Sequence, residues 1–354
     1  MVKIMRLLLS ILFVLSYCLF LFSQDEFFNT NDTTETDCSY PSLDLGYHGS
    51  GISFGNSPVW NGLRLNFSDC GVKEINGINI TFWEAGKNPD SHMNGLSVGL
   101  APNASYLRGI NLGIGGVIAN EEMSGLNIGG LAVVSNGLAR WTNLGGLAVI
   151  SNGKMEGINV GGLAIVANGP IMGINIGGLG IISNKKILGI NIGGLASVSN
   201  EEAMGINFGG LAIVSQGPIL GINVGGLAIV STGKVNGLNL SGIAVVSTGD
   251  ILGLSTTVGA IISKGSIKGI NITGYKSEAN EFLGLNIALG WSEINNFSGF
   301  SISGYNHITG VQNGLVIGLF NSAEYLHGIQ IGLLNIAKNN NGLAKVLPFI
   351  NLHF

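Results

Sequence analysis

The chain has 354 residues, of which 58 are glycine and only 10% are charged, and its net charge is −4. Low charge combined with 46% apolar residues argues against a disordered chain. The sequence contains no basic stripe, so we expect no nucleic-acid partner.

The first 23 residues have the pattern of a secretory signal peptide. Lys3 and Arg6 give it a positive start, an apolar run covers residues 7–22, and Ser23 supplies a small residue before the cleavage point. The run is shorter than the roughly 20 residues of a membrane-spanning helix. We therefore predict export across the inner membrane. Cys18 stands in a near-match to a lipoprotein box in which Tyr17 is too bulky, and the sequence leaves its lipidation open.

A polar, acidic stretch follows at residues 24–45, and we predict that it is a flexible lead-in. After cleavage two cysteines remain, Cys38 and Cys70. In an oxidising compartment they are candidates for a disulfide, and two unpaired thiols are the alternative. Neither cysteine has a CxxC or histidine partner, so we expect no zinc site.

A repeated unit organises the rest of the chain. Residues 46–108 hold irregular relatives of the unit, residues 109–283 repeat it strictly every sixteen residues, and residues 284–354 hold looser units and a terminal strand. The strict unit reads Gly-Ile-Asn-x-Gly-Gly-Leu-Ala-x-Val-Ser-Asn-Gly-x-Ile-Leu, and Trp141 takes the place of one opening glycine. Constant spacing is typical of a repeat architecture.

Each unit is predicted to be strand plus turn, because a double glycine disfavours a helix and Ser-Asn-Gly favours a turn. In one unit Ile174 and Ile176 are out of phase with Leu179 and Ile181, so a straight strand would reverse its faces between the pairs. A corner at the double glycine removes the conflict. The sequence therefore predicts an all-β parallel solenoid with one sixteen-residue coil per unit and the apolar side chains of every coil stacked inside.

The alternative is an up-and-down outer-membrane β-barrel that acts as a channel or an anchor. The apolar core of each unit is about as long as a tilted membrane strand, charges stand mostly in turns, and the chain ends on Phe354. Against a barrel, the strict units have almost no aromatic residues for interfacial girdles. The sequence favours the solenoid and keeps the barrel as the alternative.

Two columns of side chains stand out in the strict units. Asparagines at one place are predicted to form an internal amide ladder: Asn159, Asn175, Asn191, Asn207, Asn223 and Asn239. Valines at another place are predicted to point outward as a contact ridge, with burial in the next corner as the alternative: Val166, Val198, Val214, Val230 and Val246.

No residue pattern indicates catalysis. The five histidines are scattered without a partner at ligand or triad spacing. The glycine-rich stretch 111–116 opens no helix, so it lacks the context of a dinucleotide loop. Calcium β-roll repeats need an aspartate in each turn, and the turns offer only Asp250. We therefore predict no enzymatic activity, no cofactor and no metal.

The tail resembles a known group of proteins. Residues 328–337 (GIQIGLLNIA) and 347–354 (LPFINLHF), together with residues 303–307 (SGYNH) and the central repeats, look like the glycine-rich surface-repeat proteins of Gram-negative bacteria. The resemblance covers about residues 60–354. It implies a location in the cell envelope, outer membrane or cell surface, and it brings no activity. We expect a structural or adhesive protein whose partner is the outer membrane or another envelope protein, with its oligomeric state open.

Overall fold

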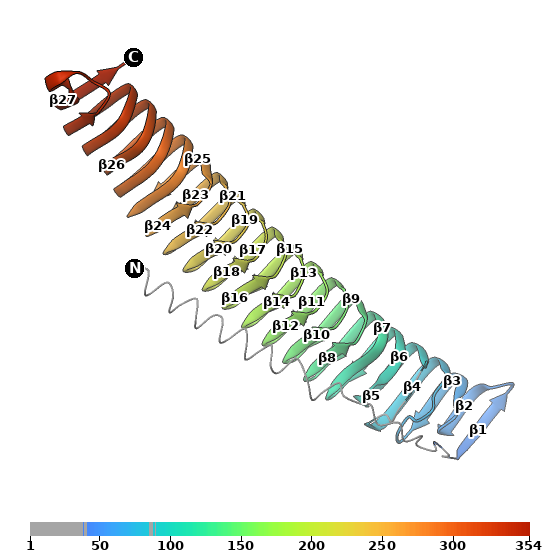
Figure 1. Ribbon diagram of the computed structural model, residues 1–354. Helices are drawn as coiled ribbons and strands as arrows, with labels where there is room; N and C mark the ends of the chain where they lie inside the picture. Colours follow the sequence, from blue (N-terminus) through green and yellow to red (C-terminus); the bar gives the residue numbers. More distant parts are fainter. Residues whose placement is uncertain (1–37, 39–40, 85–87, 89) are drawn as a thin grey trace. The chain divides into compact units, whose positions relative to one another are not determined.

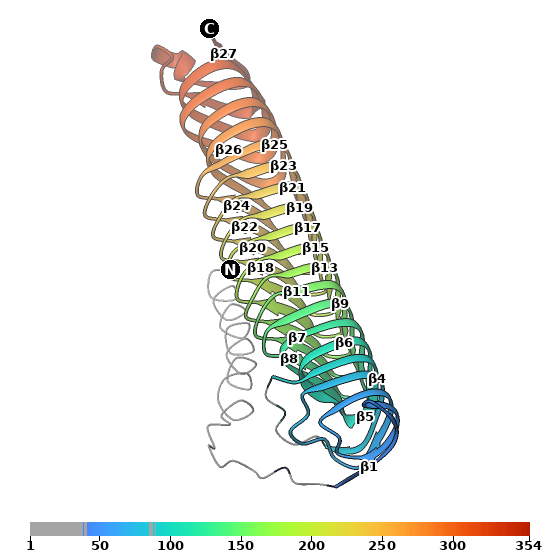
Figure 2. The same cartoon turned by 90° about the vertical axis from the view of Figure 1, so that its right-hand side faces the viewer.

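A computed structural model describes residues 38, 41–84, 88 and 90–354. The chain divides into two units, Met1–Ser39 and Tyr40–Phe354. The predicted signal peptide, Cys18 and most of the predicted lead-in lie outside the described residues. The second unit is a parallel β-solenoid, in which successive coils stack from β1 to β27 (Figure 1) and the strands form long stacks along the coils (Figure 2).

The N-terminal coils are built from strands of variable length. They are β1 (Ser42–Tyr47), β2 (Ser50–Gly55), β3 (Val59–Asn66), β4 (Glu74–Glu84), β5 (His92–Ala101), β6 (Asn103–Gly113) and β7 (Gly116–Gly129). Residues 42–45, which the sequence assigned to the flexible lead-in, belong to β1. The lead-in prediction is therefore wrong for these residues, which pair with β2.

Each strict coil contains one long and one short strand. The long strands are β9 (Leu138–Gly145), β11 (Met155–Gly161), β13 (Ile171–Gly177), β15 (Ile187–Gly193), β17 (Ala203–Gly209), β19 (Ile219–Gly225), β21 (Val235–Ser241), β23 (Ile251–Thr257) and β25 (Ser266–Thr273). The short strands are β8 (Ala132–Ser135), β10 (Ala148–Ser151), β12 (Ala164–Ala167), β14 (Gly180–Ser183), β16 (Ala196–Ser199), β18 (Ala212–Ser215), β20 (Ala228–Ser231), β22 (Ala244–Ser247) and β24 (Ala260–Ser263).

Strands of the same kind pair in parallel from coil to coil. β13 pairs with β11 and β15, and β14 pairs with β12 and β16. The register places each residue opposite the residue one unit away, as with Asn175 between Asn159 and Asn191. The solenoid prediction is confirmed. The barrel alternative is wrong, because adjacent units run in the same direction.

The two ends of the solenoid differ from its middle. β26 (Lys276–Ala337) winds on without a break, and it is followed by a 3-10 helix η1 (Gly342–Lys345) and by β27 (Val346–His353). β27 pairs antiparallel with β26, and β1 pairs antiparallel with β2. Antiparallel hairpins therefore close both ends of the parallel stack, where an uncovered strand edge would invite pairing with another chain.

The opening glycine of each unit has a conformational role. These glycines have φ between +98° and +138°, a region that side chains rarely adopt. A Cβ on Gly205 would lie 2.1 Å from the carbonyl oxygen of Gly189. Trp141 keeps the same left-handed backbone with φ of 73°. Backbone geometry and close stacking therefore favour glycine in this column, and Trp141 is an exception.

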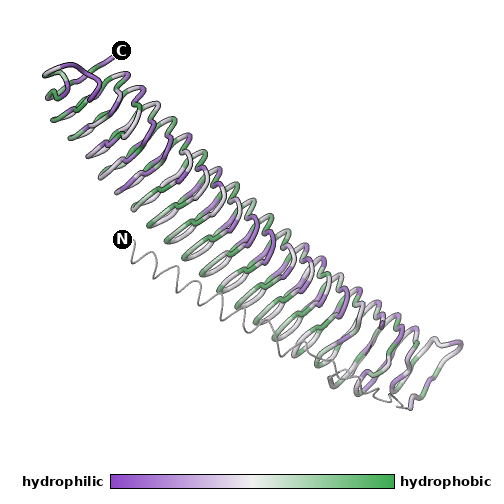
Figure 3. Tube along the Cα trace, in the orientation of Figure 1, coloured by the Kyte–Doolittle hydropathy of each residue, from purple (hydrophilic) through white to green (hydrophobic). Residues whose placement is uncertain are grey.

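The residues that line the interior of the coils differ in part from those that the sequence predicted. Ile171, Asn175 and Ile181 point inward, whereas Ile174 and Ile176 are 40% and 38% exposed. The prediction that this isoleucine pair lines the interior is wrong. Residues of a strand alternate between its faces, so the buried asparagine forces both of its neighbours outward. The long strand thus carries amides inside and aliphatic side chains outside. Hydrophobic and hydrophilic residues follow one another in a similar order from coil to coil (Figure 3).

The apolar core has one weak place. The buried apolar residues form two clusters, one ending at Ile187 and the other beginning at Ala203. In the coil between them Ser197 takes the place that Ile181 and Ile213 hold in the neighbouring coils. Its hydroxyl is buried and has no hydrogen-bond partner. The aliphatic column is therefore interrupted at this coil.

Candidate functional site

The central coils expose an apolar sector over residues 157–247, which we define by three sets of outward side chains. The first set lies on the outer face of the long strands and includes Ile174 and Ile176. The second is a column at the corner after the double glycine: Leu163, Leu179, Leu195, Leu211, Leu227 and Ile243. The third lies on the outer face of the short strands. Corner residue Leu179 is 51% exposed, so this sector is a surface and not a second core.

The predicted valine column belongs to this sector. Val214 lies between buried Ile213 and buried Ser215 and is half-buried on the outer face of β18. Val166, Val198, Val230 and Val246 have the same place and the same partial burial. The structure therefore places the column on the outside, as the sequence predicted, with its side chains partly covered by their neighbours.

Charged residues are excluded from the apolar sector. Residues 157–263 contain three lysines and three acidic residues, and all six stand in the turn that follows each short strand: Lys185, Lys186, Lys234, Glu201, Glu202 and Asp250. We call this row of turns the polar edge. Lys185 and Glu201 form an ion pair of 2.9 Å between adjacent coils, and Lys186 and Glu202 form another of 3.3 Å. The coils of residues 157–247 are therefore apolar on three sides and polar on one.

The predicted asparagine column is an internal ladder. All six members have no exposed surface, and the Asn159 amide donates to the Asn175 side-chain oxygen over 2.8 Å, as Asn175 does to Asn191. The ladder also includes Asn111, Asn127 and Asn143, which the sequence prediction left out. Their place after Gly-Ile, Gly-Leu and Trp-Thr marks them as members. The buried amides bind one another and are closed to a ligand.

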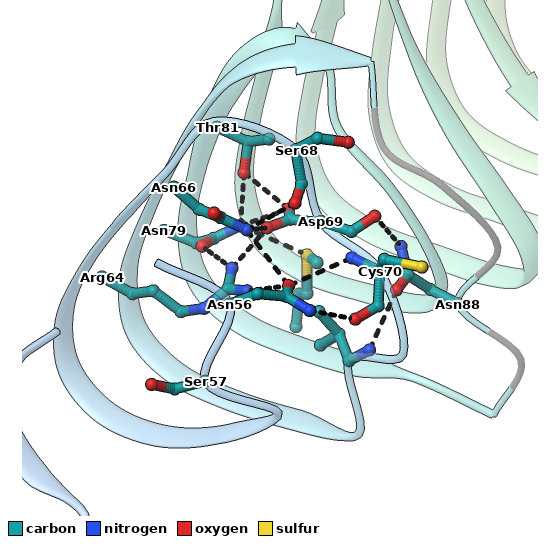
Figure 4. A network of polar contacts seen from close by, with 12 residues as sticks. Asn56, Ser57, Arg64, Asn66, Ser68, Asp69, Cys70, Asn79, Thr81 and Asn88 are labelled. Carbon is teal, nitrogen blue, oxygen red and sulfur yellow. Dashed lines mark hydrogen bonds and ion pairs between the residues drawn. The ribbon is translucent and has the colours of Figure 1, made fainter. Parts of the chain in front are cut away.

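A second polar cluster fills the N-terminal coils (Figure 4). Arg64 takes the inward place that asparagine holds in the strict units, and it forms an ion pair with Asp69 in which both side chains are fully buried. Arg64 also donates to Asn79 over 2.7 Å and to Asn56 over 2.9 Å. This cluster was not predicted from the sequence, although Gly62-Leu63-Arg64-Leu65 aligns Arg64 with the asparagine column.

Asp69 is ionised within this cluster. Burial alone raises the pKa of its carboxyl, but the Arg64 charge and hydrogen bonds from Thr81 and Asn66 outweigh burial and lower the pKa below 3.8. Thr81 donates to Asp69 over 2.5 Å and Asn66 donates over 3.0 Å. Since the carboxylate is enclosed by these donors, the cluster is a polar plug of the core and offers no access to a substrate.

The cysteine prediction concerns the same end of the chain. Cys38 and Cys70 are both disulfide-bonded in the structure, which corresponds to the oxidised alternative. Cys70 directly follows Asp69, and its backbone exchanges hydrogen bonds with the Asn56 side chain. The oxidised cysteine is thus anchored next to the buried ion pair.

An apolar hollow of about 350 Å³ lies on the C-terminal coils and is lined by Trp291, Tyr305, Phe320, Asn321, Leu334 and Ile336. The rings of Trp291 and Tyr305 meet edge to face at 5.0 Å. Its amide residue, Asn321, already donates to Asn335 over 2.7 Å, and the Tyr305 hydroxyl is hydrogen-bonded to His307. The walls of the hollow are therefore mainly apolar.

The described residues contain no group of three or more potential metal ligands. Within the same residues, none of the helical structure is long and apolar enough to cross a membrane. No family model, curated protein or solved structure matches this chain. The features available for interpretation are therefore the apolar sector, the polar edge and the N-terminal polar plug.

Proposed function

We propose that this chain is an exported, non-enzymatic protein of the bacterial cell envelope or surface that acts as a structural or adhesive rod. The supporting observation is the apolar sector, because monomeric soluble proteins rarely expose contiguous apolar patches of more than a few hundred Å². Parallel sheets are also almost always covered on both faces. The apolar outer face of the long strands therefore points to a binding surface.

The internal structure supports the same proposal. The Asp69 carboxylate is buried and accepts hydrogen bonds from Thr81 and Asn66. The asparagines of the column are buried and bind one another. A stack of identical coils carries identical side chains at regular intervals, which suits binding along an extended surface. The signal-like N-terminus and the resemblance to surface-repeat proteins support export to the envelope.

Cell fractionation of the full chain in a Gram-negative host tests this proposal. We expect the protein in the envelope fraction. Replacing two outward isoleucines, Ile190→Lys with Ile206→Lys, should release it into the soluble fraction. The matched control Asn184→Lys with Asn200→Lys adds the same charge to the polar edge and should leave the distribution unchanged. Equal retention of all three proteins in the envelope would refute a role for the apolar sector.

A further inference from the structure

The structure points to a lipid layer as the partner of the apolar sector. We propose that the solenoid lies lengthwise on a membrane, with the apolar sector against the hydrocarbon and the polar edge in water. This inference rests on the proposed function and names the occupant of the same surface. Three independent features favour lipid: the extent of the sector around each coil, the state of its backbone, and its charge.

The sector wraps around three sides of each coil. In the coil that opens at Gly173, Ile174 and Ile176 face outward from the long strand, Leu179 from the corner, and Ile182 from the short strand. A second copy with the same flat faces would cover one side and leave the others in water. A fluid lipid layer adapts to all three sides, so it removes more apolar surface from water.

Most backbone groups of the sector are hydrogen-bonded within the solenoid itself. Lipid cannot satisfy an exposed amide or carbonyl group, and each such group costs several kcal/mol. Along the sides of the solenoid, the strands pair with both neighbouring coils. The corner is also bonded: the Leu179 amide donates to the Leu163 carbonyl over 2.6 Å. The hairpin strands β1 and β27 lie at the two ends of the stack and so outside the sector.

Charge sets the limits of the sector. Outward charged residues appear at Arg140 and Glu156 before it and at Lys268 after it. Residues 157–263 carry charges only on the polar edge, where three lysines balance three acidic residues. Six coils at about 4.8 Å per coil give a sector about 29 Å long. Attraction to anionic lipids cannot drive this contact, so we expect binding by apolar burial that is insensitive to salt.

Flotation of the purified full chain with phosphatidylcholine vesicles tests the inference. We expect the chain to float with the vesicles at 0.1 M and at 1 M NaCl. Ile190→Lys with Ile206→Lys should weaken partitioning more than tenfold, and Asn184→Lys with Asn200→Lys should leave it unchanged. Circular dichroism and thermal melting of each variant establish that the β-structure is retained. Sedimentation without vesicles measures self-association.

Several results would overturn the inference. A folded chain that stays at the bottom of the gradient does not bind lipid, and self-association under those conditions would identify a second copy as the occupant. Flotation that is lost in 1 M NaCl would indicate an electrostatic contact. Equal flotation of both variants would show that the chain does not bind lipid through the apolar sector. If the sector variant leaves the envelope fraction in cells while pure lipid does not bind, the proposed function stands and the partner is a protein.

Discussion

The N-terminal coils and the central coils wind in the same way around different interiors. Near Arg64 the inward column meets a unique loop that supplies Asp69, and a buried ion pair with surrounding amides fills the core. In the central coils the same inward place holds asparagine, and each amide binds the next. The outer aliphatic places are alike in both regions. The winding therefore depends on the glycine column and the alternation of faces rather than on one interior chemistry.

The two interiors distribute their stability differently. The plug concentrates it in one charged pair, and loss of either partner leaves an uncompensated buried charge. The ladder spreads it over many equal contacts, as expected for a repeat protein in which each coil contacts only its neighbours. Substitutions in the plug should therefore have larger effects than substitutions in the ladder.

The largest effect is expected for Asp69→Asn. This change leaves the buried Arg64 without a counter-charge, so the free energy of unfolding should fall by about 3–5 kcal/mol. Chemical denaturation followed by circular dichroism measures the change. Asp90→Asn, at an exposed position, should have almost no effect. Equal stability of the two variants would contradict the importance of the ion pair.

The lowered pKa of Asp69 predicts that the stability of the chain depends on pH. Its pKa is lower in the folded chain than its ordinary value of 3.8. The stabilisation is therefore present above the unfolded pKa and is lost as pH falls through the folded pKa. Acid titration of stability should show this loss below about pH 4 in the wild-type chain. The loss should be smaller in Asp69→Asn, and identical acid profiles would argue against a lowered pKa.

The next largest loss of stability is expected for a substitution in the aliphatic column of the core. Ile181→Ala removes a fully buried side chain and should cost about 2–5 kcal/mol. Ile176→Ala, on the outer face of the neighbouring strand, should cost about 0.5 kcal/mol in water, as for a surface substitution. Denaturation midpoints of the two variants provide the comparison. A larger loss for Ile176→Ala would reverse the assignment of inner and outer faces.

A smaller loss is expected for the amide ladder. Asn191→Ala breaks two ladder bonds, one from Asn175 and one to Asn207. At about 0.5–1.5 kcal/mol for each bond, the change should cost about 1–3 kcal/mol. Asn200 belongs to an exposed row on the polar edge and donates to Asn184 over 3.2 Å. Water can replace that bond, so Asn200→Ala should be nearly neutral. Similar losses in thermal melts of the two variants would show that burial does not strengthen the ladder.

The smallest effect should be a gain. Ser197→Ile restores the aliphatic column between Ile181 and Ile213 and removes an unsatisfied hydroxyl. We expect the free energy of unfolding to rise by about 1 kcal/mol. Ser199→Ile is the contrasting change, because the Ser199 hydroxyl donates to the Lys185 carbonyl over 2.9 Å. A loss of stability in Ser197→Ile would indicate that the narrow interior cannot hold the larger side chain.

The sequence predicted the coil length, the corner after Gly177 and the asparagine ladder, because each follows from exact repetition. It was wrong in placing the neighbouring isoleucines inside as well, because residues of a strand alternate between its faces. Hydrophobicity favours burying Ile174 and Ile176, whereas burying Asn175 is possible because amides in adjacent coils satisfy one another. The plug was missed because Asp69 comes from a loop outside the repeat, although the alignment of Arg64 with Asn79 indicates an inward charge that needs a partner.

Cysteine accessibility tests the assignment of faces most directly. Single variants Ile174→Cys, Asn175→Cys and Ile176→Cys of the folded chain are exposed to a water-soluble maleimide without lipid, and the labelled sites are mapped by mass spectrometry. We predict fast labelling at positions 174 and 176 and protection at position 175 until the chain is unfolded. Fast labelling at position 175 with protection at positions 174 and 176 would contradict the inside-polar, outside-apolar arrangement.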